Sequence, residues 1–446
     1  MMGHRQVEQA ALFYEFSLER HVPADHLMRS IDRFVDLQEI RQGLAPFYSN
    51  IGRPSIDPEL MIRMLLIGYC FGIRSERRLC DEVHLNLAYR WFCRLGLDGA
   101  VPDHSTFSKN RHGRFRQSDL FRRVFESVLR RCIDERLVGG EGFAVDASLI
   151  KADANRQKGI EGEKGLSPQA AGRAIDEYLA VLDDAAFGAA TEVTPKFVSP
   201  SDPAARWTGA HGGQAFFAYS TNYLVDVENA IIVDVEATTA IRQAEVLAAK
   251  RMIERSLERF DLYPSRLLGD SGYGSAEMLG WLVYEHGIEP HVTVFDKSAR
   301  TDGIFSREDF TYDHAGEVYR CPGGKVLTTT GTLVNDGATM LYLASERDCD
   351  RCALKSRCCP KQASRRVPRS IYEGARDMAR QIARSWEGRT SRRLRKKIEM
   401  LFAHLKRSLK LDRLRLRGPH GARDEFTLAA TAQNLRKMAK LIPMPA

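Results

Sequence analysis

The 446-residue sequence lacks the features that would place it in a membrane or in a nucleotide-dependent class. No apolar run reaches the roughly 18 residues that a bilayer-spanning helix needs. The first residues, from Met1 to Gln6, do not form the apolar core of a signal peptide. No Walker or dinucleotide-binding fingerprint is present, so the sequence indicates no nucleotide cofactor. We therefore expect a cytoplasmic protein without a membrane partner.

Disulfide bonds are not expected either, although the chain has nine cysteines. Thiols stay reduced inside cells, where we expect this protein to act. Four cysteines are scattered through apolar helical sequence, which is typical of small buried hydrophobic residues. These four are Cys70, Cys80, Cys93 and Cys132, whereas the other five lie close together between Cys321 and Cys359.

Acidic residues are scarce in the last fifth of the chain. Residues 361–446 contain 23 Lys and Arg against 7 Asp and Glu, which is a net charge of +16. Because the whole chain carries +8, the remainder carries 8 − 16 = −8. A basic module on a mildly acidic body predicts a polyanionic partner, with DNA or RNA first. The alternative is a basic helical face that contacts only water.

Residues 1–138 are predicted to be helical. Asp57 and Pro58 are start signals for one helix, Ser75 can cap the next, and Ser105 can cap a third. Consecutive short helices that carry several arginines fit a helix-turn-helix-like DNA binder. They fit equally well a helical scaffold with ordinary surface arginines. We predict an N-terminal DNA-binding domain here, with the scaffold as the alternative.

Strand patterns begin after Gly139-Gly140. Three strands in succession are followed by helix, strand, helix and strand, an order that matches an RNase H-like α/β core. The expected strands and helices are Phe143–Val145, Gln214–Tyr219, Ala230–Glu236, helix Ala240–Phe260, Leu267–Asp270, helix Ser275–His286 and Pro290–Phe295, with a further helix at Pro168–Leu182.

The predicted fold class is therefore α/β, with an RNase H-like catalytic core and a Cys-rich insertion before its last helix. Residues 139–296 form the first part of this catalytic core. The insertion covers residues 297–370, and residues 371–446 form basic C-terminal core helices that contact DNA.

Three carboxylates stand out against this organisation. Asp146 ends the apolar run that starts at Gly142, and Asp270 ends the run that starts at Arg266. Glu399 lies in a very basic helical segment. Magnesium prefers oxygen ligands, and two ions about 3.5–4 Å apart can support an in-line displacement at phosphorus. In this arrangement Asp146 bridges both ions, Asp270 completes one site and Glu399 completes the other. Singly, each acid is unremarkable, since strand-end aspartates occur in many α/β proteins.

The helix around Glu399 joins this acid to cations. Arg392, Arg395, Glu399 and Lys406 are spaced by three, four and seven residues, so they share one helix face. One carboxylate among cations suits a metal ligand flanked by phosphate contacts. The alternative is an ordinary ion pair between Arg395 and Glu399 on a solvated face.

Taken together, these residues resemble the bacterial insertion-sequence transposases of the DDE type. Residues 142–148 resemble their first-aspartate strand, and Asp270 begins an Asp-x-Gly-Tyr motif like their second. Arg395, Glu399 and Lys406 match the Arg-x3-Glu-x6-Lys part of the family's Tyr-x2-Arg-x3-Glu-x6-Lys signature, although Arg392 stands at the Tyr position. The resemblance runs from about Asn50 to Lys440.

The resemblance implies an activity and its partners. Such an enzyme binds the terminal inverted repeats of double-stranded DNA, cleaves strands and joins them to target DNA with two Mg²⁺ (or Mn²⁺) ions. It implies a homodimer on DNA and a protein that is nucleoid-associated when bound. Two alternatives remain: a transposase-derived DNA-binding protein without chemistry, and an RNase H-like nuclease without strand transfer.

The clustered cysteines suggest a second metal. A Cys-x2-Cys pair with one earlier and one later cysteine can build a tetrahedral thiolate site, and a structural Zn²⁺ suits an insertion too small to bury much core. The predicted ligands are Cys321, Cys349, Cys352 and Cys358, with Cys359 as a substitute. The alternative is a set of reduced, metal-free thiols.

A second basic segment precedes the C-terminal helix, which we expect at Asp424–Leu441. Arg413, Arg415 and Arg417 alternate with leucines, so one side is basic and the other apolar. Phosphate contact by these arginines would give salt-dependent and weakly sequence-selective DNA binding.

Overall fold

The computed structural model describes residues 16–444 except 53, 168, 210–212 and 296–301. Met1 to Gln6, Pro168 and Lys297, on which some of the expectations above rest, lie outside the described residues. The chain divides into two compact units. The first unit comprises Met1–Gly139, Ala147–Asp261 and Glu399–Ala446, and the second comprises Gly140–Asp146 and Leu262–Ile398.

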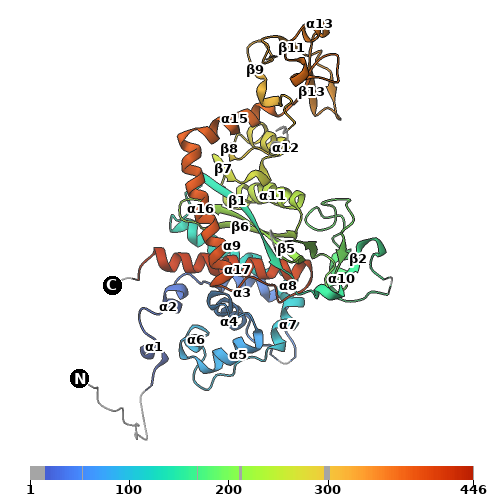
Figure 1. Ribbon diagram of the computed structural model, residues 1–446. Helices are drawn as coiled ribbons and strands as arrows, with labels where there is room; N and C mark the ends of the chain where they lie inside the picture. The colour runs from blue at the N-terminus through green and yellow to red at the C-terminus, as the bar shows by residue number, and fades with distance from the viewer. Residues whose placement is uncertain (1–15, 53, 168, 210–212, 296–301, 445–446) are drawn as a thin grey trace, which may run out of the picture. The chain divides into compact units, whose positions relative to one another are not determined.

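The N-terminal region of the first unit is helical, as predicted (Figure 1). Asp57 accepts a hydrogen bond from the Glu59 amide and begins α4, and Ser75 caps α5 through the Arg78 amide. The expectation for Ser105 was wrong, because Ser105 is the first helical residue of α7 and its amide donates to the Asp103 carboxylate. The helices are α1 Leu18–His21, α2 Leu27–Asp32, α3 Gln38–Leu44, α4 Pro58–Phe71, α5 Glu76–Leu85, α6 Leu87–Phe92, α7 Ser105–His112, α8 Arg114–Gln117 and α9 Leu120–Asp134.

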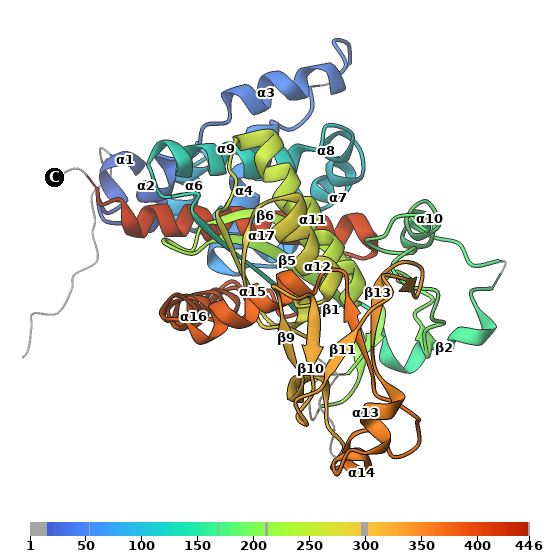
Figure 2. The same cartoon turned by 90° about the horizontal axis from the view of Figure 1, so that it is seen from above.

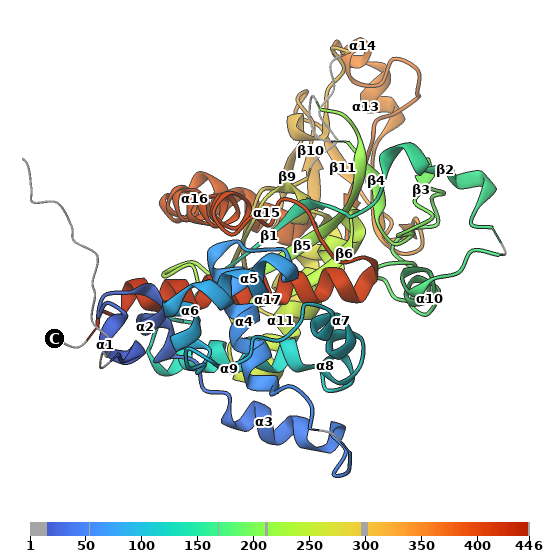
Figure 3. The same ribbon diagram turned by 90° about the horizontal axis from the view of Figure 1, so that it is seen from below.

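A long C-terminal helix, α17 (Gly418–Leu441), forms the core of the first unit with these helices. It contacts α4, α9 and strand β6 (Figure 3). Asn434 is fully buried, and its side chain bonds both the amide and the carbonyl of Ile232 at 2.9 and 2.8 Å. The helix starts six residues before the expected Asp424, because Pro419 fits the first turn, where its missing N–H costs nothing.

The strands of the first unit are longer than the sequence pattern suggested. They are β2 Ile160–Glu161, β3 Phe197–Val198, β4 Arg206–Thr208, β5 Phe216–Asp226 and β6 Ile232–Thr239, accompanied by helices α10 Arg173–Leu179 and α11 Arg242–Phe260. Strands β5 and β6 pair antiparallel. The expected strand stopped at Tyr219 because Ser220, Thr221 and Asn222 are polar. All three are fully buried, and the Asn222 amide donates to the Glu236 carbonyl and the Thr238 hydroxyl.

The second unit contains three parallel strands. Strand β1 (Gly142–Lys151) pairs with β7 (Arg266–Gly269), which pairs with β8 (Glu289–Val292). The residues of β1 belong to both units, and the mixed sheet has the strand order β4-β5-β1-β7-β8, with β6 paired to β5. Helices α12 (Ala276–Gly280, continued by a wide turn, Trp281–Glu285) and α15 (Glu373–Arg384) accompany the parallel strands.

The placement of Asp146 at a strand end was wrong. Strand β1 continues for five residues beyond it, to Lys151. The polar Asp146 interrupts the apolar pattern, so periodicity alone stops the strand at Val145. The hydrogen-bonded pairing of β1 with β7 nevertheless covers only Gly142 to Ala144.

The cysteine-rich region folds as a small antiparallel sheet with the strand order β12-β13-β11-β10-β9, and β14 pairs with β13. Strands β9, β10, β11 and β13 of this sheet lie side by side in Figure 2. Four aromatic rings, from Phe310, Tyr312, Tyr319 and Tyr342, pack with Leu327 in its core. The elements are β9 Thr311–Asp313, β10 Val318–Arg320, β11 Val326–Thr328, β12 Leu333–Val334, β13 Thr339–Ala344, α13 Glu346–Asp350, α14 Lys355–Cys358 and β14 Arg366–Ser370.

Candidate active site and cysteine cluster

The register of β1 and β7 predicts equivalent positions for Asp146 and Asp270. In their parallel pairing Ala144 lies opposite Leu268, an offset of 268 − 144 = 124 residues. The same offset leads from Asp146 to Asp270, since 270 − 146 = 124. Neighbouring strands lie about 4.8 Å apart, and residues in register point to the same face of a sheet. Continuing this register by two residues would bring both carboxylates to the same face of the sheet, on adjacent segments of the chain.

Asp270 directly follows β7, as the sequence predicted, and is exposed. Its Oδ1 accepts a hydrogen bond from the Gly272 amide at 2.6 Å. A Cβ atom on residue 272 would lie 2.6 Å from the same oxygen, so only glycine lets the carboxylate approach this backbone. Tyr273 is buried and contacts Gly269 closely. The Asp-x-Gly-Tyr motif thus fixes the orientation of an exposed carboxylate.

The long helix α16 (Trp386–Arg407) begins in the second unit against β7 and β8. Its residues Ser391, Arg392 and Arg395 line one pocket together with residues of both strands, including Gly269. The Ser391 hydroxyl and His291 Nδ1 are 2.7 Å apart. Arg392 donates to the carbonyl of Ala383 at 2.9 Å. Arg392 and Arg395 therefore line the same pocket as Gly269, the residue that precedes Asp270.

Glu399 lies one turn after Arg395 on α16, and the sequence predicted this helix correctly. The boundary between the two units falls between Ile398 and Glu399, within the continuous helix. Lys406, two turns further on, is half-buried, and burial lowers the pKa of its ammonium group while Asp412 opposes this shift. The shared face of Arg395, Glu399 and Lys406 follows from the unbroken helix.

No three His, Cys, Asp or Glu side chains lie close enough to hold a metal ion among the residues that the structure describes. The two aspartates offer hard oxygen ligands on adjacent segments of the chain. This fits the one or two protein carboxylates that usually bind a magnesium ion. Whether Glu399 joins them stays a prediction.

The three arginines of the second basic segment do not form one set. Arg413 and Arg417 both bind the carboxylate of Asp153, each at 3.0 Å, and are half-exposed. Arg415 is exposed and lines a separate cavity, which also contains Glu425. The predicted alternation with buried leucine holds for Leu414, which is fully buried.

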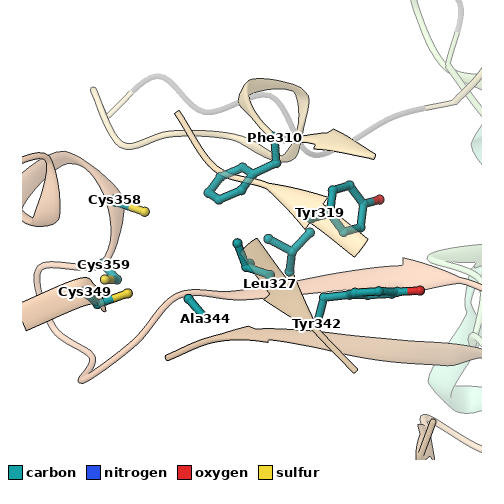
Figure 4. Packing of buried hydrophobic residues seen from close by; sticks show 9 residues of the cluster. Phe310, Tyr319, Leu327, Tyr342, Ala344, Cys349, Cys358 and Cys359 are labelled. Carbon is teal, nitrogen blue, oxygen red and sulfur yellow. The ribbon is translucent and has the colours of Figure 1, made fainter. Parts of the chain in front are cut away.

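All five clustered cysteines line one pocket, with Lys325, Asp348, Lys355 and Arg365. Cys349, Cys358 and Cys359 gather at one end of the aromatic core described above (Figure 4). Burial raises the pKa of the Cys358 thiol to about 11. None of the cysteines, all of which the structure describes, forms a disulfide bond.

The other two cysteines, Cys321 and Cys352, lie in tight turns. The Lys325 amide donates to Cys321 Sγ at 3.3 Å. A Cβ atom on Gly323 would lie 3.7 Å from the sulfur of Cys321 and 3.5 Å from that of Cys352. Both distances are ordinary van der Waals contacts, and they show that the two sulfur atoms lie beside the same turn. The predicted ligand set is gathered in one place, although no metal geometry is formed.

Two regions of the chain match known protein families. Residues 16–113 match the Transposase domain (DUF772), and residues 320–439 match the Transposase DDE domain. The chain is a transposase that carries a DDE transposase domain. The second match includes Arg395, Glu399, Lys406 and the cysteines, whereas Asp146 and Asp270 lie outside it. DDE transposases generally use divalent metal ions and act on DNA.

No helix among the described residues of this transposase is long and apolar enough to cross a membrane.

Sequence reasoning missed two polar contacts made by α16 and by the second basic segment. The pairing of His291 with Ser391 joins β8 to α16, and burial lowers the pKa of His291. Asp153 binds two of the arginines predicted to contact DNA. Neither residue belongs to a motif, and both contacts join segments at least 100 residues apart, so no local signal could have revealed them.

Proposed function

We propose that this transposase cleaves and joins DNA through Asp146, Asp270 and Glu399, which hold two Mg²⁺ (or Mn²⁺) ions. The observation that carries the proposal is the parallel register of β1 and β7, whose continuation brings the two aspartates to adjacent positions. A second support is the strand order β6-β5-β1-β7-β8, which is the order expected for an RNase H-like core.

The protein side chains have distinct tasks in this proposal. When bound, the metal ions activate the attacking oxygen and neutralise charge at the scissile phosphate. Asp146 and Asp270 hold them from the sheet, and Glu399 holds them from α16. Arg392, Arg395 and Lys406 bind phosphates beside the scissile bond. Because these cations share one helix face, they can contact successive phosphates of the DNA backbone. Arg413, Arg415 and Arg417 bind phosphates further along.

The partner is double-stranded DNA that carries the terminal inverted repeats, and later the target DNA. A 3′-hydroxyl freed by cleavage attacks a phosphodiester in the target, so that a new phosphodiester bond forms while the target's own P–O3′ bond breaks and its 3′-oxygen leaves. Joining two ends requires both to be held together, so we propose a homodimer on DNA. Residues 1–138 contribute to DNA binding, and residues 371–446 supply the basic core helices.

Cleavage of inverted-repeat DNA in Mg²⁺ tests the catalytic assignment. We expect Asp146→Asn, Asp270→Asn and Glu399→Gln to lose cleavage by at least about 100-fold while DNA affinity is kept, because positioning and charge neutralisation carry this chemistry. Glu258→Gln, which neutralises an exposed acid on α11, is the matched control and keeps full activity. Normal cleavage by Glu399→Gln would remove this residue from the site.

The same assay separates the alternatives by product. Cleavage without joined products would indicate a nuclease, and DNA binding without cleavage would indicate a binding protein derived from a transposase. The proposal requires both cleaved and joined DNA.

We also propose a structural Zn²⁺ held by Cys321, Cys349, Cys352 and Cys358, with Cys359 nearby as a substitute. Its support is the pocket lined by all five thiols. Metal analysis of the purified protein is expected to give about one zinc per chain. Cys352→Ser should lower this value, whereas Cys80→Ser, outside the pocket, should not. A wild-type stoichiometry near zero contradicts the proposal.

A further inference from the structure

A cavity of about 250 Å³ lies within the first unit, and none of the three proposed metal-binding carboxylates lines it. Its lining comes from α4, the start of α5, α7, the segment before α17, and α17 itself. This volume is several times the roughly 30 Å³ that one water occupies in the liquid. Arg74, Arg111, Arg415, Glu76 and Glu425 are its charged lining residues.

The floor of the cavity contains a buried guanidinium with unused donors. The Arg74 side chain is 5 % exposed and lies 4.5 Å above the ring of Tyr69. It contacts the buried carboxylate of Glu425, but its Nη1 has no hydrogen-bond partner among the described residues. The Nε of Arg111, whose side chain is 4 % exposed, has none either. Buried donors of this kind are costly unless something binds them.

The charges of the cavity leave an excess of one positive charge. Three arginines face two glutamates, and 3 − 2 = +1. Glu76 pairs with Arg111 at 2.5 Å, and one oxygen of Glu425 accepts from two backbone amides. The Oδ2 atom of Asp424 lies 3.8 Å from Nε of Arg111, beyond hydrogen-bond distance, and burial raises the pKa of this carboxyl to about 7. The lining residues alone carry this single positive charge, and it matches one phosphodiester.

Two further features favour an anion here. Ser75 and Glu76 line the cavity at the N-terminus of the ten-residue helix α5, where the helix dipole and unpaired amides attract negative charge. Arg415, unlike the buried Arg74, is exposed. It belongs to the basic segment that the proposed function assigns to DNA, between Arg413 and Arg417.

We propose that this cavity binds one phosphate group of DNA, with Arg415 at the surface and Arg74 and Arg111 inside. The choice of DNA as the phosphate source rests on the proposed function. The cavity itself is a phosphate site whether or not the enzyme cleaves.

Two assays with the full-length protein test this site. Inorganic phosphate at about 10 mM should raise the thermal unfolding midpoint of the wild type by roughly 1–2 °C, because a ligand that binds only the folded state stabilises it. Arg415→Gln should lose this shift. It should also weaken DNA binding roughly fivefold at low salt and reduce the slope of log K against log salt by about 0.9, the value for one lost phosphate contact.

Two further variants control for the loss of an arginine as such and for an unpaired buried charge. Arg131→Gln also removes one exposed arginine, but outside the cavity, so it should keep the phosphate shift. Arg74→Met combined with Glu425→Gln removes the buried pair together and should lose the shift without leaving an unpaired charge.

Each outcome decides the proposal. A phosphate shift that persists in Arg415→Gln and in the double variant overturns the site. Loss of the phosphate shift with an unchanged DNA salt slope overturns DNA as the source and indicates a free anion. Failure of the wild type to cleave DNA contradicts the proposed function only, since the phosphate assay does not depend on cleavage.

Discussion

At the scale of single residues, buried ion pairs hold the first unit together more than surface pairs do. Glu425 is 1 % exposed, contacts Arg74, and accepts hydrogen bonds from the amides of Arg415 and Leu416 at 2.6 Å. Removal of one member of such a group leaves a buried charge and unsatisfied donors. The pair Arg78–Glu82 is instead on the surface, where water screens it.

We therefore expect Glu425→Ala to lower the free energy of unfolding by about 3–5 kcal/mol. Glu82→Ala is the control and should cost about 0.5 kcal/mol or less. Urea denaturation of both variants measures the difference. Equal losses would show that the Arg74–Glu425 contact is not formed.

Glu177 gives a prediction about pH. Burial alone would raise the pKa of this carboxyl, but contacts with His420 and Arg116 outweigh burial and lower it to about 2. Because the folded-state pKa lies below the unfolded value of 4.5, the resulting stability is present above about pH 4.5 and is lost as the pH falls towards 2. The stability gap between wild type and Glu177→Gln should therefore narrow from pH 5 to pH 3, as followed by urea denaturation. A gap that stays constant over this range contradicts the shifted pKa.

At the scale of elements, capping residues predicted the starts of α4 and α5 but not that of α7, and long-range pairing was not predictable. The start of α4 at Asp57-Pro58 and of α5 at Ser75 follows from capping, which needs only neighbouring residues. The full length of β5 was not predictable, because two of its polar residues bond other elements: the Asn222 amide donates to β6, and the Ser220 hydroxyl donates to Glu245 of α11. Asp146 was misplaced for a similar reason, since only the sheet shows that β1 continues past a polar residue.

The docking of α16 yields a prediction at this scale. The Ser391 hydroxyl bonds His291 on β8, and the same helix carries Arg395 and Glu399. Ser391→Ala should lower the free energy of unfolding by about 1 kcal/mol. As a positioning residue it should also lower kcat for DNA cleavage more than it lowers DNA affinity.

Thr390→Ala is the matched control, because its hydroxyl is exposed and bonds only its own helix, at the Trp386 carbonyl. Urea denaturation and cleavage kinetics should leave it close to wild type. If Ser391→Ala behaves in the same way, the contact between β8 and α16 carries no positioning role.

At the scale of the whole molecule, the three proposed carboxylates come from segments that lie far apart in the sequence. Asp146 and Asp270 belong to the second unit, and Glu399 is the first residue of the last segment of the first unit. The sequence could name all three because each lies in a motif with its own spacing. It could not supply their mutual distances, which depend on how segments more than 100 residues apart are brought together.

The count of bound manganese ions tests this assignment most directly. Mn²⁺ titration of the protein–DNA complex, followed by electron paramagnetic resonance, should give two ions per active site in the wild type. It should give fewer in Asp146→Asn and in Glu399→Gln, because each variant removes a carboxylate ligand. Two ions bound with wild-type affinity in both variants would contradict the proposed metal site.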